Sequence, residues 1–223
     1  MSAQTRLFMF TIEYDFFNLY HLKEKHKATV QKYFYGTVMS FSEGPIKGTL
    51  REVNLGEGLI LQMADFNLST DHILKGLPHK EHHYAIHFVY VKNNTGFNFT
   101  FNGISSAINF PEIQAAIMTN DEDAISFFGK AKLQYEVMSI IVPRNWLQQH
   151  IPELFEANNL LDRYFGLKEQ RIWLNMTNNT LTQQIKIAFE LQDGPFYKPL
   201  MEKMAGFIIS SFFMHMEMKM QRL

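Results

Sequence analysis

The last helix predicted in this chain, from about Tyr197 onward, constrains the fold most, because it is apolar on two sides. Two rows of apolar residues run along it and are displaced from each other by two positions. Two positions correspond to about 200° around an α-helix, so the rows lie on opposite sides. One row can pack on the domain that carries the helix. The other then needs a further partner, most simply the same helix of a second copy.

A helix buried on all sides within one monomer is the alternative, and the pattern does not choose between the two. We assign the first row, which has a heptad-like spacing, to a dimer interface. This row consists of Leu200, Met204, Phe207, Ser211, Met214 and Met218, and the second of Ile209, Phe213, Met216 and Met220.

The composition is that of a globular protein with a large apolar core. Of the 223 residues, 46% are hydrophobic and 19% are charged, which argues against disorder. The 21 Phe residues mean that many large rings must be buried or must line a cavity.

Several classes of protein do not fit this composition. The absence of Cys excludes a disulfide scaffold, a thiolate metal site and a Cys nucleophile. The net charge of −1 lacks the basic surplus of a domain that grips DNA. Met1–Arg6 leads into a mixed aromatic and acidic stretch, so we expect no signal peptide, and no apolar run approaches the roughly 18 residues that span a membrane. We therefore expect a cytoplasmic protein without membrane contacts.

The segment from Lys47 to Val142 has the alternation of β-strands. Residues 82–91 alternate with both faces largely apolar, which predicts a strand inside a barrel or sandwich. Asn102-Gly103 is a strong hairpin signal and joins residues 97–101 to residues 104–110. A last strand covers residues 132–142, and its alternation changes phase at Val137-Met138, which predicts a bulge.

Three segments follow from these patterns. Residues 1–46 form an N-terminal extension, in which residues 21–32 read as a solvated helix or loop. Residues 47–142 form an antiparallel β-barrel or sandwich, and Pro143 ends its last strand. Residues 143–223 form helices. Strands first and helices second predict an α+β fold with segregated parts.

The densest group of possible metal ligands consists of His79, Glu81, His82, His83 and His87. On a strand His83 and His87 share a face but lie about 13 Å apart along it, too far to bind one metal ion. Polar residues at the entrance of a strand are the simpler interpretation. Nucleophile elbows and glycine-rich phosphate loops are also absent. We expect no metal, no cofactor and no enzyme activity.

The aromatic β segment is the remaining candidate for a binding site. Small-molecule pockets are mostly apolar and contain a few polar anchors. The alternative is that the aromatic rings simply fill the core. The candidate ligand-binding residues are Arg51, Gln62, His83, His87, Phe97, Phe99 and Phe101.

The order of these segments resembles the N-terminal sensing and dimerisation half of AraC-type transcription regulators, in the form common in Bacteroidetes. Each matching stretch is short, and together they span roughly residues 47–220. They are Gly58-Leu-Ile-Leu-Gln-Met-Ala-Asp-Phe-Asn-Leu, His83-Tyr-Ala-Ile-His-Phe-Val-Tyr-Val, Phe97-Asn-Phe-Thr-Phe-Asn-Gly, Pro143-Arg-Asn-Trp-Leu, Leu160-Leu-Asp-Arg-Tyr-Phe and Pro195-Phe-Tyr-Lys-Pro-Leu.

The resemblance implies a cupin-like barrel, a helix that pairs across a homodimer and an unknown small-molecule effector. It also implies DNA binding only through a C-terminal helix-turn-helix domain that these residues do not include. A chain cut at the domain boundary and a natural orphan domain both fit. A stand-alone cupin-like protein that binds a small molecule or a metal is the alternative function, and a solid barrel that only dimerises is a third.

Overall fold

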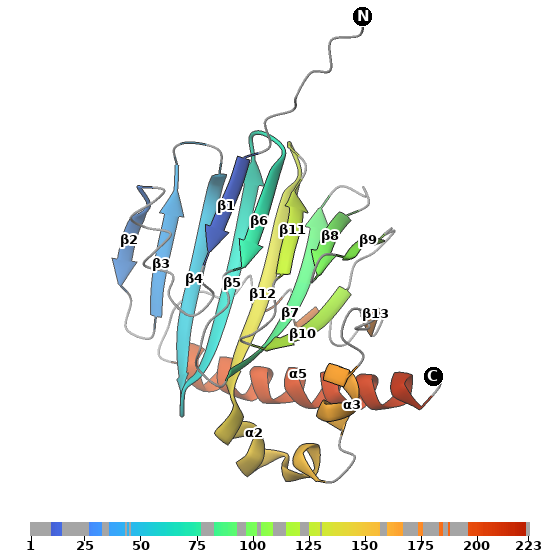
Figure 1. Ribbon diagram of the computed structural model, residues 1–223. Helices are drawn as coiled ribbons and strands as arrows, with labels where there is room; N and C mark the ends of the chain where they lie inside the picture. Colours follow the sequence, from blue (N-terminus) through green and yellow to red (C-terminus); the bar gives the residue numbers. More distant parts are fainter. Residues whose placement is uncertain are drawn as a thin grey trace, which may run out of the picture.

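The strands of this chain form two sheets that stack face to face, with a long helix across the larger sheet (Figure 1). The computed structural model describes residues 10–14, 27–32, 36–42, 44, 46–76, 83–92, 97–101, 104–108, 115–120, 125–129, 131–156, 160–166, 174–175, 183–184, 187 and 196–221.

The larger sheet has eight strands, and every pairing in it is antiparallel. The order across the sheet is β13 (Leu174–Asn175), β10 (Ala115–Asn120), β7 (His83–Lys92), β12 (Gln134–Pro143), β5 (Leu59–Leu68), β4 (Ile46–Gly56), β3 (Gly36–Phe41) and β2 (Thr29–Lys32).

The smaller sheet has five strands and contains one parallel pair, between β1 and β6. Its order is β1 (Phe10–Tyr14), β6 (His72–Gly76), β11 (Ile125–Gly129), β8 (Phe97–Phe101) and β9 (Ile104–Ile108). Phe101 pairs with Ile104 across the predicted Asn102-Gly103 turn, so the hairpin is confirmed.

The helical segment follows directly on the last long strand. Its elements are α2 (Arg144–His150), a 3₁₀ helix (Pro152–Phe155), α3 (Leu160–Gly166) and α5 (Tyr197–Met220). Pro199 lies in the first turn of α5, where backbone N–H groups have no partner within the helix, so proline is tolerated there. Within the segment predicted to be helical, residues 176–182 and 188–195 lie outside the described residues.

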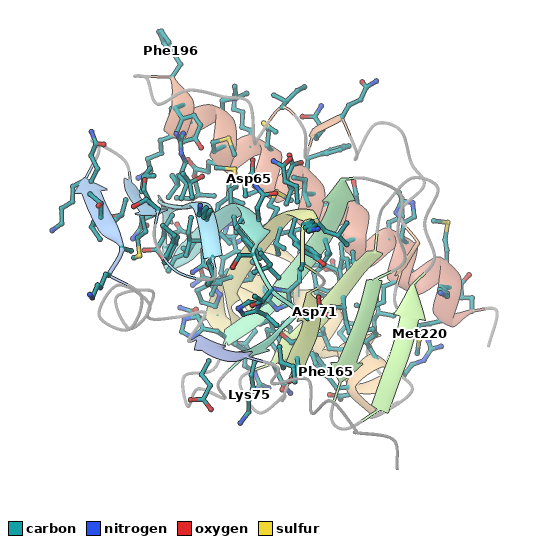
Figure 2. All side chains as sticks on the ribbon, turned by 90° about the horizontal axis from the view of Figure 1, so that it is seen from above. Asp65, Asp71, Lys75, Phe165, Phe196 and Met220 are labelled. Atoms are coloured by element: carbon teal, nitrogen blue, oxygen red, sulfur yellow. The ribbon has the colours of Figure 1, made fainter. Side chains whose placement is uncertain are left out.

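Helix α5 lies on one face of the larger sheet, and the smaller sheet lies on the other, as the view from above shows (Figure 2). The core between α5 and the larger sheet contains buried residues such as Ile86, Phe88 and Phe212. The rings of Phe88 and Phe212 meet edge to face with centroids 6.3 Å apart. This contact fixes which side of β7 faces the helix, and the alternate residues of β7 therefore face the smaller sheet.

The predicted α+β plan, with an antiparallel sandwich followed by helices, is confirmed. Two details differ. Residues 29–32 form strand β2 and residues 36–41 form β3, so the sheet extends into the segment expected to be an extension. The prediction of a bulge at Val137-Met138 is wrong, because β12 keeps register with both β5 and β7 at these residues. β12 is a central strand buried on both faces, so its sequence does not alternate.

The helices among the described residues include none long and apolar enough to cross a membrane.

Candidate functional site

A row of polar side chains crosses the face of the larger sheet that points away from α5. Glu52 of β4 pairs with Gln62 of β5, Gln62 pairs with Ser139 of β12, and Ser139 pairs with His87 of β7. Directly opposite residues in a sheet point to the same face. Four strands therefore bring these side chains into one line, and Thr119 of β10 joins them through its contact with His87. We call these five side chains the interior row.

His87 lies between Ser139 and Thr119 in the row and has no exposed surface. Its Nδ1 lies 2.9 Å from the hydroxyl of Ser139, and its Nε2 lies 3.0 Å from the hydroxyl of Thr119 on β10. Burial lowers the pKa of His87 to about 3, so the imidazole is neutral at physiological pH. A neutral ring has one donor and one acceptor nitrogen. One hydroxyl therefore accepts from the ring, and the other donates to it.

Glu52 forms the outer end of the row. The Nε2 of Gln62 donates a hydrogen bond to a carboxylate oxygen of Glu52 over 3.2 Å. Burial raises the pKa of this carboxyl group, and the bond from Gln62 acts in the opposite direction. Glu52 is partly exposed, whereas Gln62, Ser139 and His87 are buried. The row therefore leads from the margin of the sandwich into its interior.

The surroundings of the row are apolar. Val89 and Ile117 flank His87 on the same face, and Met39 lies on the same face of β3; all three are buried. A buried polar group left without a hydrogen bond destabilises a protein by about 1–3 kcal/mol. A set of polar side chains with mutual hydrogen bonds in an apolar interior matches the make-up of small-molecule sites.

The structure brings together only some of the residues predicted to bind a ligand. Gln62 and His87 belong to the interior row, and His83 lies on the same face at the start of β7. Arg51 does not join them, which corrects the prediction. It lies on the opposite face of β4, with its guanidinium carbon 5.7 Å from the centre of the Tyr197 ring in α5.

Phe97, Phe99 and Phe101 lie on β8 of the smaller sheet, and their side chains are outside the described residues. Glu52, Thr119 and Ser139 were missed by sequence reasoning. Ser139 had the clearest signal, because it is a polar residue within the apolar run of residues 137–142. Thr119 and Glu52 had no signal of their own, since only strand pairing brings Thr119 to His87 and Glu52 to Gln62.

A metal centre has no support among the residues that the structure describes, where no group of three His, Asp or Glu could hold an ion. Both ring nitrogens of His87 face hydroxyl groups rather than open space. Residues 77–82, with His79, Glu81 and His82, lie outside the described part of the chain.

The second functional feature is the surface of α5. The row assigned to the domain core is buried as expected: Ile209, Phe213, Met216 and Met220 are at most 7% exposed. Four residues of the predicted dimer seam are the exposed ones, with fractions of 42% for Leu200, 48% for Phe207, 52% for Met214 and 43% for Met218. We call these four residues the outer stripe.

Met204 and Ser211, also assigned to the seam, are 6% and 7% exposed and are buried within the chain itself. They lie on the flank of the stripe that turns toward the larger sheet, so the interface prediction is corrected at these two positions. Phe196, 82% exposed, precedes the helix and points away from the body of the protein (Figure 2).

No protein-family model matches this chain. No curated protein is significantly similar to it. Solved structures are similar to part of this chain at low TM-scores. A cupin-2 domain of an XRE-family transcriptional regulator from Enterobacter cloacae is 13% identical, with a TM-score of 0.33 over 45% of this chain and 100% of that one.

Two further structures are similar at the same level. An HTH_3-family transcriptional regulator from Vibrio cholerae is 14% identical, with a TM-score of 0.31 over 45% of this chain and 52% of that one. Ectoine synthase from P. lautus is 16% identical, with a TM-score of 0.29 over 50% and 75%. Regulators and an enzyme appear together, and none of the three is described as an AraC-type protein.

Proposed function

We propose that this chain binds a small molecule in its β-sandwich and forms a homodimer through α5, as the sensing and dimerisation part of an AraC-type transcription regulator. DNA binding would belong to a separate domain. The observation that carries the proposal is the two-sided helix: one face of α5 is buried on the larger sheet, and the outer stripe leaves Leu200, Phe207 and Met214 about half exposed at intervals of seven residues. That spacing is the repeat by which two helices pair.

The charges beside the outer stripe favour an antiparallel pair. Lys203, Ser210 and Glu217 are also seven residues apart, and all three are exposed along one flank of the stripe. In an antiparallel pair equivalent flanks meet, and a two-fold axis at Ser210 places Lys203 opposite Glu217 of the partner subunit. In a parallel pair this flank would meet the uncharged flank that carries Met204 and Ser211. Exposed ion pairs contribute only about 0.2–1 kcal/mol each, so they set orientation more than affinity.

The absence of Cys makes this geometry directly testable by crosslinking. We expect Ser210→Cys to form a disulfide-linked dimer on mild oxidation, because the two copies of residue 210 meet at the axis. Lys203→Cys alone should not crosslink, whereas a mixture of Lys203→Cys and Glu217→Cys should. Gln149→Cys, on the exposed surface of α2, is the control. A chain that sediments as a monomer at micromolar concentration would contradict the dimer, and a dimeric Ser210→Cys protein that does not crosslink would contradict the antiparallel geometry.

The interior row indicates the chemistry of the small molecule. It contains two hydroxyl groups and an amide beside a neutral imidazole whose two nitrogens already contact the hydroxyl groups, and its one ionisable acid is Glu52. An anionic ligand would be repelled by the Glu52 carboxylate, and a neutral polyol or an amine would not.

Three four-carbon probes test this preference by thermal shift. We expect erythritol or 1,4-diaminobutane to raise the melting temperature and succinate to leave it unchanged. Gln62→Met should abolish the shift, whereas Gln149→Ala on α2 should keep it. Unchanged melting with both erythritol and 1,4-diaminobutane would remove the support for a polar effector in the row.

We also propose that the chain has no enzyme activity of its own, since the low pKa of His87 makes its imidazole a poor general base. A stand-alone metal-binding protein is the competing function. Metal analysis of the purified protein distinguishes them: stoichiometric metal that is lost on His83→Ala would favour the competitor.

A further inference from the structure

The exposed methionines of the described residues both belong to the outer stripe. Met214 and Met218 are 52% and 43% exposed, whereas every other methionine that the structure describes is at most 7% exposed. Because they are four residues apart on α5, their side chains lie next to each other on one face of the helix. The accessible thioether groups of the described chain are therefore gathered on the surface that we assign to the homodimer.

An exposed thioether reacts with oxidants. The chain contains no Cys, so it has no thiol that would react with an oxidant first. Oxidation of methionine to its sulfoxide is reversible, and it converts a flexible apolar side chain into a polar one. Burial keeps an oxidant away from sulfur, so the reaction should select Met214 and Met218 among the described methionines.

The antiparallel pair proposed above determines what each of these sulfurs meets in the dimer. A two-fold axis at Ser210 brings each position after the axis opposite the position equally far before it. Met214, four residues after the axis, then lies opposite Phe207 of the partner subunit, three residues before it. Met218 likewise lies close to the partner's Leu200. The four residues of the outer stripe thus cover one another on the same flank.

Oxidation changes what this interface requires at Met214. A thioether beside an aromatic ring is a favourable contact. A sulfoxide oxygen in the same place needs a hydrogen-bond donor, and burying it without one is unfavourable. A phenyl ring offers no donor, and the N–H groups in the middle of a helix are already bonded within the helix. Met218 is farther from the axis, near the end of the stripe, where water can reach an added oxygen.

We propose that Met214 and Met218 are reversible oxidation sites at which a peroxide dissociates the homodimer. The sulfur lone pair attacks one oxygen of the peroxide, an S–O bond forms and the O–O bond breaks. The transferred oxygen gives its proton to the leaving oxygen, which departs as water or an alcohol. Sulfur loses two electrons and the peroxide gains them.

The reverse step needs a reductant, which a methionine sulfoxide reductase takes from a dithiol. The sulfoxide oxygen leaves as water, sulfur regains two electrons, and the dithiol becomes a disulfide. The proposal rests on the proposed function, because it requires the homodimer.

Dimerisation and oxidation exclude each other in this scheme. The pair covers the outer stripe, so the oxidant reacts with the free monomer. We expect sulfoxide formation at Met214 to slow as the protein concentration rises through the dimer dissociation constant, as measured by peptide mapping with mass spectrometry. A rate that stays equal while the protein dimerises would mean that the dimer leaves Met214 accessible, and it would overturn the proposal.

Hydrogen peroxide tests the sites in the full chain. Limited treatment should oxidise Met214 and Met218 before the buried Met204 and Met216 of the same helix. Conversion of Met214 should raise the dissociation constant in sedimentation by at least about tenfold, because each dimer then buries two sulfoxide groups without donors. A methionine sulfoxide reductase with dithiothreitol should restore the original value. Oxidation of the buried methionines first, or an unchanged dissociation constant with Met214 fully converted, would overturn the proposal.

Leucine variants identify the sulfur that carries the effect. Each variant is compared with itself before and after peroxide, so a change in its own dimer affinity does not enter the comparison. Met214→Leu should lose most of the response, and Met218→Leu should keep most of it. A full response in Met214→Leu would assign the effect to another methionine and contradict the proposal.

Sedimentation before any oxidant is added separates the two ways in which the proposal can fail. A reduced chain that is monomeric contradicts the homodimer, and the oxidation switch with it. A reduced dimer that persists after oxidation of Met214 contradicts the oxidation switch alone and leaves the proposed function intact.

Discussion

His87 shows at the scale of one residue how burial sets chemistry. Its pKa of about 3 lies below the value of about 6.5 that a histidine has in an unfolded chain. Below pH 6.5 the unfolded state therefore binds a proton that the folded state does not, and the folded state loses stability down to about pH 3.

We expect the free energy of unfolding to fall by up to about 1.4 kcal/mol per pH unit through this one group. Urea unfolding between pH 7 and pH 5 measures the slope. His87→Gln and His87→Leu should both lower the slope by that amount, and an unchanged slope in both variants would refute this account of the imidazole.

Gly58 shows how a single turn residue can be fixed by its neighbours. It has φ of +77° in the turn between β4 and β5, and a Cβ added there would lie 2.8 Å from Cγ of Pro143. Gly44 has a similar φ of +81°, and a Cβ there would meet nothing within 4 Å. Left-handed backbone costs a residue with a Cβ roughly 1–2 kcal/mol.

We expect Gly44→Ala to lower the free energy of unfolding by that strain alone and Gly58→Ala to lower it by more, as measured in urea. Equal losses for the two variants would mean that the contact with Pro143 relaxes without cost.

At the scale of the element, α5 has one face that is buried against its own domain and another that is exposed to solvent. Met216 has no exposed surface, and Met214, two residues away, is half exposed. Replacing a buried methionine by alanine removes transfer energy and leaves a cavity, at a cost of about 2–5 kcal/mol. We expect Met216→Ala to lower the free energy of unfolding by this amount. Met214→Ala should change it by less than about 0.5 kcal/mol in the dilute monomer.

The effects of the two variants on dimer affinity should be the reverse of their effects on stability. Met214→Ala should weaken the dimer in sedimentation, because it shortens the outer stripe, and Met216→Ala should leave the affinity of the folded fraction unchanged. If Met214→Ala dimerises as the parent does, the outer stripe is not the interface.

At the scale of the whole molecule, folding and association should be linked. A partner that binds only the folded chain adds stability that grows with its concentration. We expect the melting temperature to rise with protein concentration, and Phe207→Lys to remove this dependence because it places a charge within the outer stripe. Asn145→Lys on α2 should retain it. Calorimetry across a hundredfold range of concentration measures the effect, and concentration-independent melting of the parent chain would contradict a dimer.

The amino-acid pattern determined the elements of this protein. Alternation along residues 82–91, the Asn102-Gly103 signal and the two rows of the last helix are local patterns, and burial imposes such periodicity on strands and helices. These patterns were sufficient for the α+β plan, the hairpin and the row of α5 that enters the core. The phase change at Val137-Met138 was misinterpreted because a strand buried on both faces has no alternation to read.

Only the tertiary structure decided which side chains meet. The interior row joins Glu52, Gln62, His87, Thr119 and Ser139 from five strands, and register across the sheet, not spacing along the chain, brings them together. The same register separates Arg51 from the row. Met204 and Ser211 follow the heptad spacing and are still buried, since a helix of 3.6 residues per turn drifts about 20° per heptad and the sheet covers one flank of the stripe. Periodicity is a property of neighbouring residues, whereas a site is a property of the surfaces that the fold brings together.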